Sequence, residues 1–237
     1  METKPIRNKT GPLSRYFHTD IEKIEIGVDE AGRGPLFGRL YVAGAVLPKD
    51  DRYRHDLMKD SKRFSSEKKI REAAEYIKAN AVAWTVRFAE SDLIDEINIR
   101  QAVLKTMREC CRDLIEKTGG TPDTCCLLID GNDFPAYTMF DPATETLVEV
   151  ESHTVEGGDN QYTCIAAASI LAKVARDDWI HELCVKHPVL NEWYGIDKNK
   201  GYGTATHMKG IREHGITCWH RRSYGPCKES TLVDATQ

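Results

Sequence analysis

The sequence lacks any long hydrophobic run. No apolar stretch approaches the roughly 18 residues that a membrane-spanning helix requires, and residues 1–20 contain no apolar segment typical of a secretory signal. Those twenty residues are expected to form a flexible, mildly basic arm, because terminal segments are usually loose. The sequence therefore predicts no association with a membrane and a cytoplasmic location.

The C-x-x-C spacing of metal-binding and redox motifs is also missing. The 237 residues include eight cysteines but no C-x-x-C spacing, and a disulfide framework is typical of much smaller secreted domains. Two cysteines open the apolar run CCLLID and are expected to be ordinary core residues. A possible zinc set, whose spacing matches no standard zinc module, consists of His214, Cys218, His220 and Cys227. A reduced, intracellular protein is therefore expected.

An overall excess of positive charge is absent. The formal net charge is -4, which argues against a protein that coats nucleic acid non-specifically. Basic residues nevertheless dominate residues 197–228, where the only acidic residues are Asp197 and Glu213. The basic residues of this stripe are Lys198, Lys200, Lys209, Arg212, Arg221, Arg222 and Lys228. A local basic stripe on an acidic protein suits an enzyme that binds metal with carboxylates and phosphates with another surface.

The sequence does contain short apolar strands that alternate with helical patterns. Strands are predicted over residues 24–29, 40–47, 81–89, 125–130 and 147–155. Helices are predicted over residues 65–80, 99–117 and 163–184. This order favours an α/β fold in which helices flank a mixed β-sheet, followed by a basic, glycine-punctuated C-terminal region. No internal repeat is visible.

Carboxylates stand at the ends of several predicted strands. Asp29 and Glu30 end the first strand before a glycine-rich turn, Asp130 closes CCLLID, and Asp159 precedes the last helix. Two divalent ions about 4 Å apart need several oxygen ligands that converge from different strands. A single aspartate is more often a turn former or a helix cap, and four other acids compete for the same role, namely Asp133, Glu156, Asp177 and Asp178.

A dinucleotide-binding loop is a second interpretation of the segment DEAGRGPLFG. The glycine spacing there is G-x-G-x-x-x-G, with Pro35 inside it. The dinucleotide fingerprint instead requires G-x-G-x-x-G at the start of a helix, so this interpretation is weak.

Six segments, in this order, resemble the signature blocks of type 2 ribonuclease H, the bacterial ribonuclease HII group. They are GVDEAGRGP, DSKRFS, LIDGN, AAASILAKVARD, NKGYGTATH and HRRSYGP, and they run from Gly27 to Pro226. The resemblance implies a ribonuclease H-like mixed β-sheet flanked by helices, with a helical C-terminal extension. It also implies an endonuclease that cuts the RNA strand of RNA/DNA hybrids, and cuts duplex DNA 5′ of an embedded ribonucleotide. Such an enzyme would support removal of RNA primers and misincorporated ribonucleotides.

The same resemblance implies roles for individual residues. The ligands of two Mg²⁺ or Mn²⁺ ions would be Asp29, Glu30, Asp130 and Asp159. The loop of Gly32, Arg33 and Gly34 would sense the ribose 2′-hydroxyl, which backbone groups can approach only where no Cβ intervenes. Tyr202 would recognise the junction between ribonucleotide and deoxyribonucleotide. Contacts to the substrate backbone would come from Ser61, Lys62, Lys200, Arg221 and Ser223, and His207 and His220 could also orient phosphates.

The resemblance divides the chain into three segments. The arm of residues 1–20 precedes a ribonuclease H-like catalytic domain over residues 21–186, and residues 187–237 form the basic substrate-binding region. The chain departs from the family pattern where Glu156 and two glycines, instead of a lysine, precede Asp159, and residues 131–158 are longer than in short members. A monomer is expected.

Two other functions stay open on the same fold. One is a catalytically silent nucleic-acid-binding module, which the four carboxylates argue against. The other is a metal-dependent DNA nuclease, which the glycine-arginine-glycine loop and the Tyr202 segment argue against.

Overall fold

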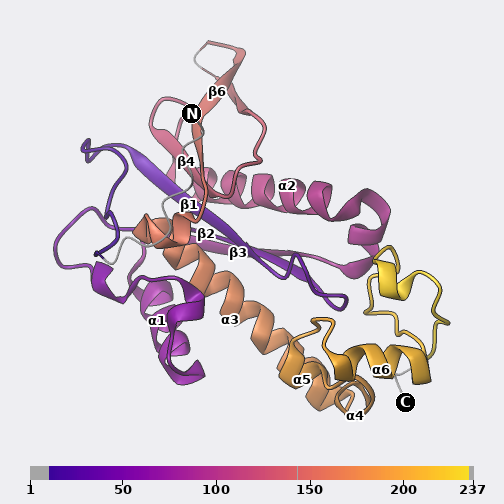
Figure 1. Ribbon diagram of the computed structural model, residues 1–237. Coiled ribbons are helices and arrows are strands. Elements are labelled where there is room, and N and C mark those ends of the chain that lie inside the picture. Colours follow the sequence, from indigo (N-terminus) through magenta and orange to yellow (C-terminus); the bar gives the residue numbers. More distant parts are fainter. Residues whose placement is uncertain (1–10, 143, 235–237) are drawn as a thin grey trace, which may run out of the picture.

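The computed structural model describes residues 11–142 and 144–234 and contains a six-stranded mixed sheet with helices on both faces (Figure 1). The strands are β1 (Ile24–Ala31), β2 (Leu40–Val46), β3 (Ala83–Ala89), β4 (Cys125–Asp130), β5 (Tyr137–Asp141) and β6 (Thr146–Val155). The α-helices are α1 (Glu67–Asn80), α2 (Ser91–Thr118), α3 (Thr163–Lys186), α4 (Val189–Tyr194), α5 (Ile196–Asn199) and α6 (Ala205–His214). Short 3-10 turns are η1 (His55–Leu57), η2 (Ser61–Arg63), η3 (Gly158–Asn160) and η4 (Gly225–Cys227). None of the helices in these described ranges is long and apolar enough to cross a membrane.

The strand order across the sheet is β3-β2-β1-β4-β6-β5. Strands β1, β4 and β6 are parallel neighbours, whereas β2, β3 and β5 join by antiparallel pairing. The carboxyl ends of β1 and β4 therefore meet at one edge of the sheet, because parallel strands run in the same direction. The mixed α/β fold predicted from the sequence is confirmed.

Helix α2 covers one face of the sheet, and α1 and α3 cover the other (Figure 1). Ser66 caps α1 by accepting a hydrogen bond from the Lys69 amide at 3.3 Å. The start of α3 packs closely on β1, since a Cβ at Gly27 would come within 2.3 Å of the Cys164 carbonyl carbon. This contact fixes the helix against the strand that carries Asp29 and Glu30.

Two elements differ from the sequence prediction. Helix α2 begins at Ser91, eight residues before the predicted start, but it breaks at Asn98, where φ is 67°. The Asn98 side chain accepts a hydrogen bond from the Gln101 amide at 3.1 Å and so caps the predicted segment. Strand β5 was not predicted; it pairs with β6 at the sheet edge, and the two strands together occupy much of the long 131–158 segment.

The prediction of a flexible arm over residues 1–20 is wrong for residues 14–18. Ser14 donates to the Gln161 carbonyl at 2.7 Å and accepts from the Thr163 amide at 3.0 Å. The amides of Phe17 and His18 donate to the Glu25 carboxylate at 2.9 and 2.8 Å. These bonds tie the segment to the body of the domain, and the first ten residues lie outside the described part of the chain.

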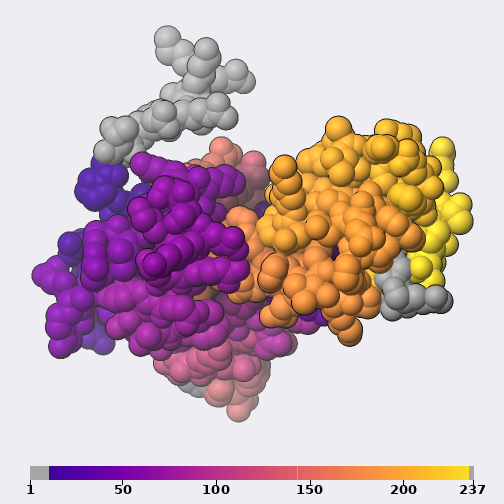
Figure 2. Space-filling view, turned by 90° about the horizontal axis from the view of Figure 1, so that it is seen from below, coloured from indigo at the N-terminus to yellow at the C-terminus, as the bar shows by residue number. Residues whose placement is uncertain are grey.

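Helices α4, α5 and α6 form a third apolar cluster, beyond the end of α3, in addition to the clusters on the two faces of the sheet. Leu190, Tyr194 and Ile211 are buried there together with Leu36 and Phe37, which follow the glycine-rich turn. The space-filling view shows this orange and yellow C-terminal region beside the purple surface that includes α1 (Figure 2). The C-terminal region is therefore anchored directly on the loop that follows β1.

Candidate active site

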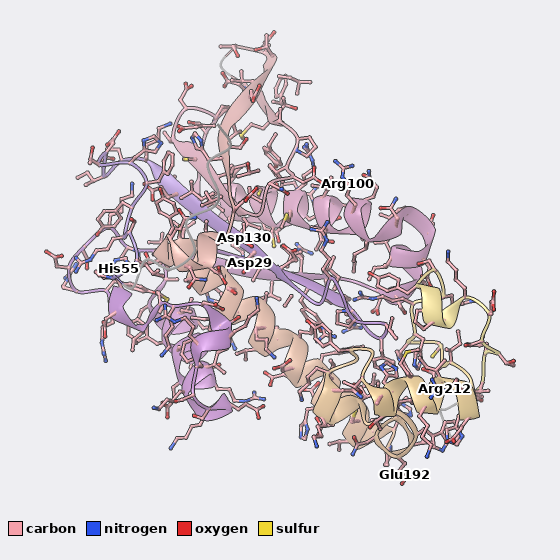
Figure 3. The ribbon with its side chains drawn as sticks, viewed as in Figure 1. Asp29, His55, Arg100, Asp130, Glu192 and Arg212 are labelled. Carbon is pink, nitrogen blue, oxygen red and sulfur yellow. The ribbon has the colours of Figure 1, made fainter. Side chains whose placement is uncertain are left out.

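Acidic side chains gather at the carboxyl ends of β1 and β4. Val28 and Ile129 are register partners, so the next residues, Asp29 and Asp130, lie on neighbouring strands. Their labelled side chains lie close together above the first turns of α3 (Figure 3). Asp159 belongs to η3, which immediately precedes α3. Residues separated by up to 130 positions in sequence are thus brought to one edge of the sheet.

Burial raises the pKa of all four predicted acids, and the charges of neighbouring carboxylates add to the rise. Burial raises the pKa of Asp29 well above its usual range, and the charges of Asp130 and Glu30 raise it further. Burial and the Asp130 charge raise the pKa of Glu30, and burial raises that of Asp130. The pKa of Asp159 rises to about 6, through burial and the charges of Asp60 and Asp130. The protein itself therefore does not neutralise this cluster, which is the electrostatic property that a divalent-cation site requires.

Backbone and hydroxyl groups hold these carboxylates in position. The Gly158 amide donates to Asp130 at 2.7 Å, and the Glu30 amide donates to Asp29 at 2.6 Å. Asp29 also accepts from Ser169 of α3, whose hydroxyl lies 3.2 Å from that of Ser61. The predicted residue Ser61 is therefore linked to Asp29 through one intervening hydroxyl.

Asp60 is a fifth acid at the site that the sequence analysis missed. Its side chain caps η2 by accepting from the Lys62 amide at 2.8 Å, and it lies 3.3 Å from the Asn160 amide nitrogen. Asp60 raises the pKa of Asp159, whereas Lys62 lowers it. The signal available in the sequence was its place beside Ser61 and Lys62 in DSKRFS.

The acids that competed for the metal-binding role have other partners. Glu156 is exposed and accepts from Asn132 at 3.3 Å. The remaining three form ion pairs, Asp133 with Arg100, Asp177 with Lys173, and Asp178 with Arg71. These pairs leave the group around Asp29 as the uncompensated acidic cluster among the candidates.

The glycine-arginine-glycine loop follows directly after β1 and faces Tyr202. Gly32 has φ +97°, and a Cβ there would lie 2.3 Å from the Nε of Arg176, so only glycine fits. A Cβ at Gly34 would lie 3.7 Å from the Cε1 of Tyr202. Arg33 is exposed and its guanidinium lies 3.8 Å from Glu30. The fold therefore brings the loop, Tyr202 and the acidic cluster into one continuous surface.

Arg221 is not available to a phosphate, contrary to the sequence prediction. Its side chain is 0% exposed and donates to the carbonyls of Gly32 at 2.6 Å and of Arg33 and Gly38 at 3.0 Å. All three carbonyls belong to the turn that follows β1. Arg221 thus holds the loop in shape from beneath.

Ser223 is engaged within the protein as well. Its amide and hydroxyl donate to Asp95 at 2.8 and 2.5 Å. The phosphate contact expected of this hydroxyl is therefore not supported.

His207 and His220 are fully buried and form a chain of hydrogen bonds that ends at Tyr202. The Thr217 amide donates to Nδ1 of His220 at 3.0 Å, so the His220 proton must be on Nε2. That nitrogen lies 3.0 Å from Nε2 of His207, whose Nδ1 then donates to the Tyr202 carbonyl at 3.0 Å. Burial lowers the pKa of His207 and, together with the charge of His207, lowers that of His220 to about 3. Both rings stay neutral and position Tyr202, so the phosphate role considered for them is wrong.

The possible zinc set in the C-terminal region is not assembled. Both nitrogens of His220 are engaged with Thr217 and His207, and His214 stacks on Trp193 with ring centroids 4.6 Å apart. His214 and His220 therefore serve packing and hydrogen bonding, and the set is not among the metal-binding groups found in the described residues.

Lys200 lines a cleft between α1 and the C-terminal helices. The cleft has a volume of about 1010 Å³ and is lined also by Arg71, Lys68 and His181 on its basic side and by glutamates of α1. The Lys200 ammonium lies 3.2 Å from Asp197, and its carbonyl accepts from Arg176 at 2.7 Å. Lys200 therefore lies close to the loop through Arg176, whereas Lys62 lies close to the acids.

The sheet has this mixed strand order, buried acids at the ends of two parallel strands, and a loop with glycine on both sides of Arg33 beside them. Together these features define a metal-dependent nuclease with a ribonuclease H-like fold. The sequence matches the family described as Ribonuclease HII over residues 26–227. It is 40% identical over 202 residues to the Ribonuclease HII of Parabacteroides distasonis, an alignment that covers 85% of this chain and 90% of that protein. The chain belongs to the ribonuclease HII family, as the sequence motifs predicted.

Solved structures agree on the fold. The ribonuclease HII of Archaeoglobus fulgidus, solved as a complex with PCNA, matches with a TM-score of 0.61 at 24% identity, covering 85% of this chain and 95% of that one. Bst-RNase HIII, solved in complex with Mn²⁺, matches with a TM-score of 0.65 at 16% identity, covering 87% and 68%. Family membership makes this protein a metal-dependent endoribonuclease that cleaves the RNA of RNA/DNA hybrids and embedded ribonucleotides.

Proposed function

We propose that Asp29, Glu30, Asp130 and Asp159 hold two divalent ions, Mg²⁺ or Mn²⁺, and that these residues are the catalytic centre. The observation that carries the proposal is that the four carboxyl groups converge at one sheet edge, where Asp29 and Asp130 follow register partners on β1 and β4 and the amide of Gly158, the residue before Asp159, donates to Asp130 at 2.7 Å. The raised pKa values of all four groups agree with this arrangement. Hard carboxylate oxygens are the ligands that both ions prefer. When bound, the ions supply an activated water and stabilise the leaving 3′-oxygen, so the products carry a 3′-hydroxyl and a 5′-phosphate.

The protein's own residues contribute orientation and charge. The Gly158 amide and the Ser169 hydroxyl fix Asp130 and Asp29, so the ligands need little rearrangement when cations bind. Lys62 stands near Asp130 and Asp159 and is suited to hold a phosphate next to the cut. Ser61 joins this contact through its link to Ser169.

The loop of Gly32, Arg33 and Gly34 senses the ribose 2′-hydroxyl through its backbone groups. Support comes from the close packing at Gly32, where Arg176 and Arg221 support the loop without adding a side chain to its exposed surface. Tyr202 has 51% of its surface exposed and offers a ring on which a deoxyribose can pack. Cutting then falls 5′ of the ribonucleotide at a junction with DNA, which suits removal of RNA primers and misincorporated ribonucleotides.

The substrate-binding region extends over residues 187–237 and acts with the catalytic domain of residues 21–186. Lys200 faces the cleft beside α1 and is suited to a flanking phosphate. The enzyme works as a monomer in the cytoplasm. Arg221 and Ser223 are left out of the phosphate-contacting set because their donors are used within the protein.

Asp29→Asn tests the catalytic centre. We expect cleavage of a DNA duplex with one ribonucleotide to fall roughly a thousandfold, because one charged ligand of the ions is lost, a cost of about 4 kcal/mol. Binding of the same duplex without metal should change little. Asp133→Asn is the matched control, since Asp133 pairs with Arg100 away from the cluster. Near-normal turnover by Asp29→Asn would reject the assignment.

Tyr202→Ala tests the recognition of the junction. We expect a larger loss of cleavage at a single embedded ribonucleotide than on a long RNA/DNA hybrid, with little change in affinity for all-DNA duplex. Tyr202→Phe should retain most activity, because the ring and not the hydroxyl packs on the sugar. Equal losses on both substrates would contradict this role.

A further inference from the structure

A second cluster of metal-binding side chains lies at the opposite end of the same parallel strands. Glu25, Cys126 and Glu151 are register partners across β1, β4 and β6, and Cys126 stands four residues, or about 13 Å, before Asp130 along β4. The N-terminal segment brings His18 over this row. Ligand atoms of His18, Cys126 and Glu151 lie within 4.8 Å of one another, and no other trio of His, Cys, Asp and Glu in the described ranges is that compact.

The contacts within this cluster converge on the carboxylate of Glu151. The Nε2 atoms of His18 and His153 lie 2.8 and 2.9 Å from the same Glu151 oxygen, and the Cys126 thiol also donates to Glu151. Lys23 binds the other oxygen at 3.1 Å. Hydrogen bonds from His153, Lys23 and His18 hold the pKa of Glu151 at about 2, so the carboxylate is ionised.

We propose that His18, Cys126, Glu151 and His153 bind one zinc-class transition-metal ion. A thiolate, two imidazoles and a carboxylate form a donor set that zinc prefers and Mg²⁺ does not. Tetrahedral zinc with Zn–N and Zn–O bonds near 2.0–2.1 Å separates its ligand atoms by roughly 3.3 Å. The contacts of His18 and His153 with the Glu151 oxygen, at 2.8 and 2.9 Å, need to open by a few tenths of an ångström. The ligand atoms of His18, Cys126 and Glu151 lie within 4.8 Å of one another and need to close toward this distance, and His153 joins that trio through its contact with Glu151.

The surroundings of the cluster hold its ligands in place before any ion binds. Glu25 accepts hydrogen bonds from the amides of Phe17 and His18, which fixes the backbone of the His18 ligand. The Phe17 ring packs against that of His153 with centroids 4.5 Å apart. Cys126 is 0% exposed, so its thiolate would be protected from solvent.

A bound metal ion would take the place of the protons that now form hydrogen bonds between Cys126, the two histidines and Glu151. The Cys126 thiol loses its proton to solvent when the metal–sulfur bond forms, and the imidazole nitrogens bind in their neutral form. Uptake of the ion should therefore release about one proton, the one carried by the Cys126 sulfur. The bound ion would join the N-terminal segment to β4 and β6.

Titration of the full chain with Co²⁺, at saturating Mg²⁺, tests the proposal. Mg²⁺ occupies the carboxylate cluster around Asp29, and any Co²⁺ there would have oxygen ligands and give no sulfur band. We expect one equivalent of Co²⁺ to produce a thiolate-to-cobalt charge-transfer band and the visible bands of tetrahedral Co²⁺, and Zn²⁺ to discharge both. Absence of the charge-transfer band would overturn the proposal.

Variants separate this site from other thiols. Cys126→Ser should abolish the charge-transfer band, and His18→Ala should weaken Co²⁺ binding at least tenfold, since His18 is partly exposed and its loss should not disturb folding. Cys125→Ser is the matched control, because Cys125 is equally buried but packs in the cluster on the other face of the sheet. A band that persists in folded Cys126→Ser would refute the ligand set. Cleavage of an RNA/DNA hybrid with Mg²⁺ should be retained in His18→Ala, which distinguishes this outcome from failure of the catalytic assignment.

Discussion

Replacement of Arg221 by methionine tests whether a buried guanidinium shapes the loop that we propose to contact ribose. The side chain is 0% exposed, and it donates to three carbonyls of the turn that follows β1. The Arg33 carbonyl keeps a second donor, the Tyr224 hydroxyl at 2.8 Å. Arg221→Met therefore removes the guanidinium donor from the Gly32 and Gly38 carbonyls, and each buried acceptor left unpaired costs about 1–3 kcal/mol.

The gross loss of about 2–6 kcal/mol is offset in part because a buried cation without a carboxylate partner no longer has to be desolvated. We expect a net destabilisation of about 2–4 kcal/mol, which corresponds to a decrease in Tm of about 5–15 °C for a chain of this size. Thermal unfolding followed by circular dichroism measures it. Cleavage at one embedded ribonucleotide should fall more than cleavage of a long hybrid, because the loop loses its shape.

Arg222→Met is the control for this experiment. Arg222 is the next residue, but its side chain is 53% exposed and its guanidinium lies 3.4 Å from Asp92, and exposed ion pairs contribute about 0–1 kcal/mol. If both variants unfold at the same temperature and cleave alike, Arg221 does not support the loop.

Two further predictions concern the loop and the acids. Gly32→Ala should destabilise the fold by at least about 2 kcal/mol and reduce cleavage at single ribonucleotides, because positive φ alone costs about 1–2 kcal/mol and the added Cβ displaces buried Arg176. The control is Gly119→Ala, which has φ +64° and open space around the added Cβ and should show the backbone cost alone. Equal losses of stability in the two variants would contradict the clash with Arg176. Without metal, the pKa of Asp159 is about 6 in the folded protein, compared with the ordinary value of 3.8. The protonated carboxyl group therefore stabilises the fold fully below about pH 4, and this contribution is lost as the pH rises through 6. At about 1.4 kcal/mol per pKa unit, this contribution amounts to about 3 kcal/mol at most. Denaturant unfolding in the presence of a chelator should therefore show that the free energy of unfolding of the wild type falls by up to this amount between pH 4 and pH 7, relative to Asp159→Asn. The same change with pH in both proteins would refute this prediction.

The strands that carry the acids were predictable from sequence because their signals are local. CCLLID is an apolar run that ends on a carboxylate, and β4 spans those same residues, Cys125–Asp130. The capped helix α1 and the small-residue helix α3 were predictable for the same reason. The raised pKa values of Asp29 and Asp159 required the fold, since they depend on charges from other strands and turns.

The positions of Arg221 and β5 depend on contacts that the sequence does not display. Arg221 stands next to Arg222 within the basic stripe of residues 197–228, a pattern typical of a surface, but it is buried by a turn more than 180 positions earlier in the chain. Strand β5 has mixed burial at a sheet edge, so its hydrophobic alternation is weak. Asp60 was overlooked because its relation to Asp159 arises only when η2 meets η3.

Helix α3 passes from the acidic cluster to the underside of the loop of residues 32–34, for which we propose the role of sensing ribose. Ser169 contacts Asp29, and Arg176 contacts Gly32 seven residues later, a rise of about 10 Å along one rigid helix. The helix thus fixes the distance between the acidic cluster, where we propose that the bond is cut, and the loop that we propose to contact the ribose. A single residue inserted between Ser169 and Arg176 would rotate one end of helix α3 by about 100° relative to the other. The acidic cluster and the loop could then no longer act on neighbouring nucleotides of the same strand.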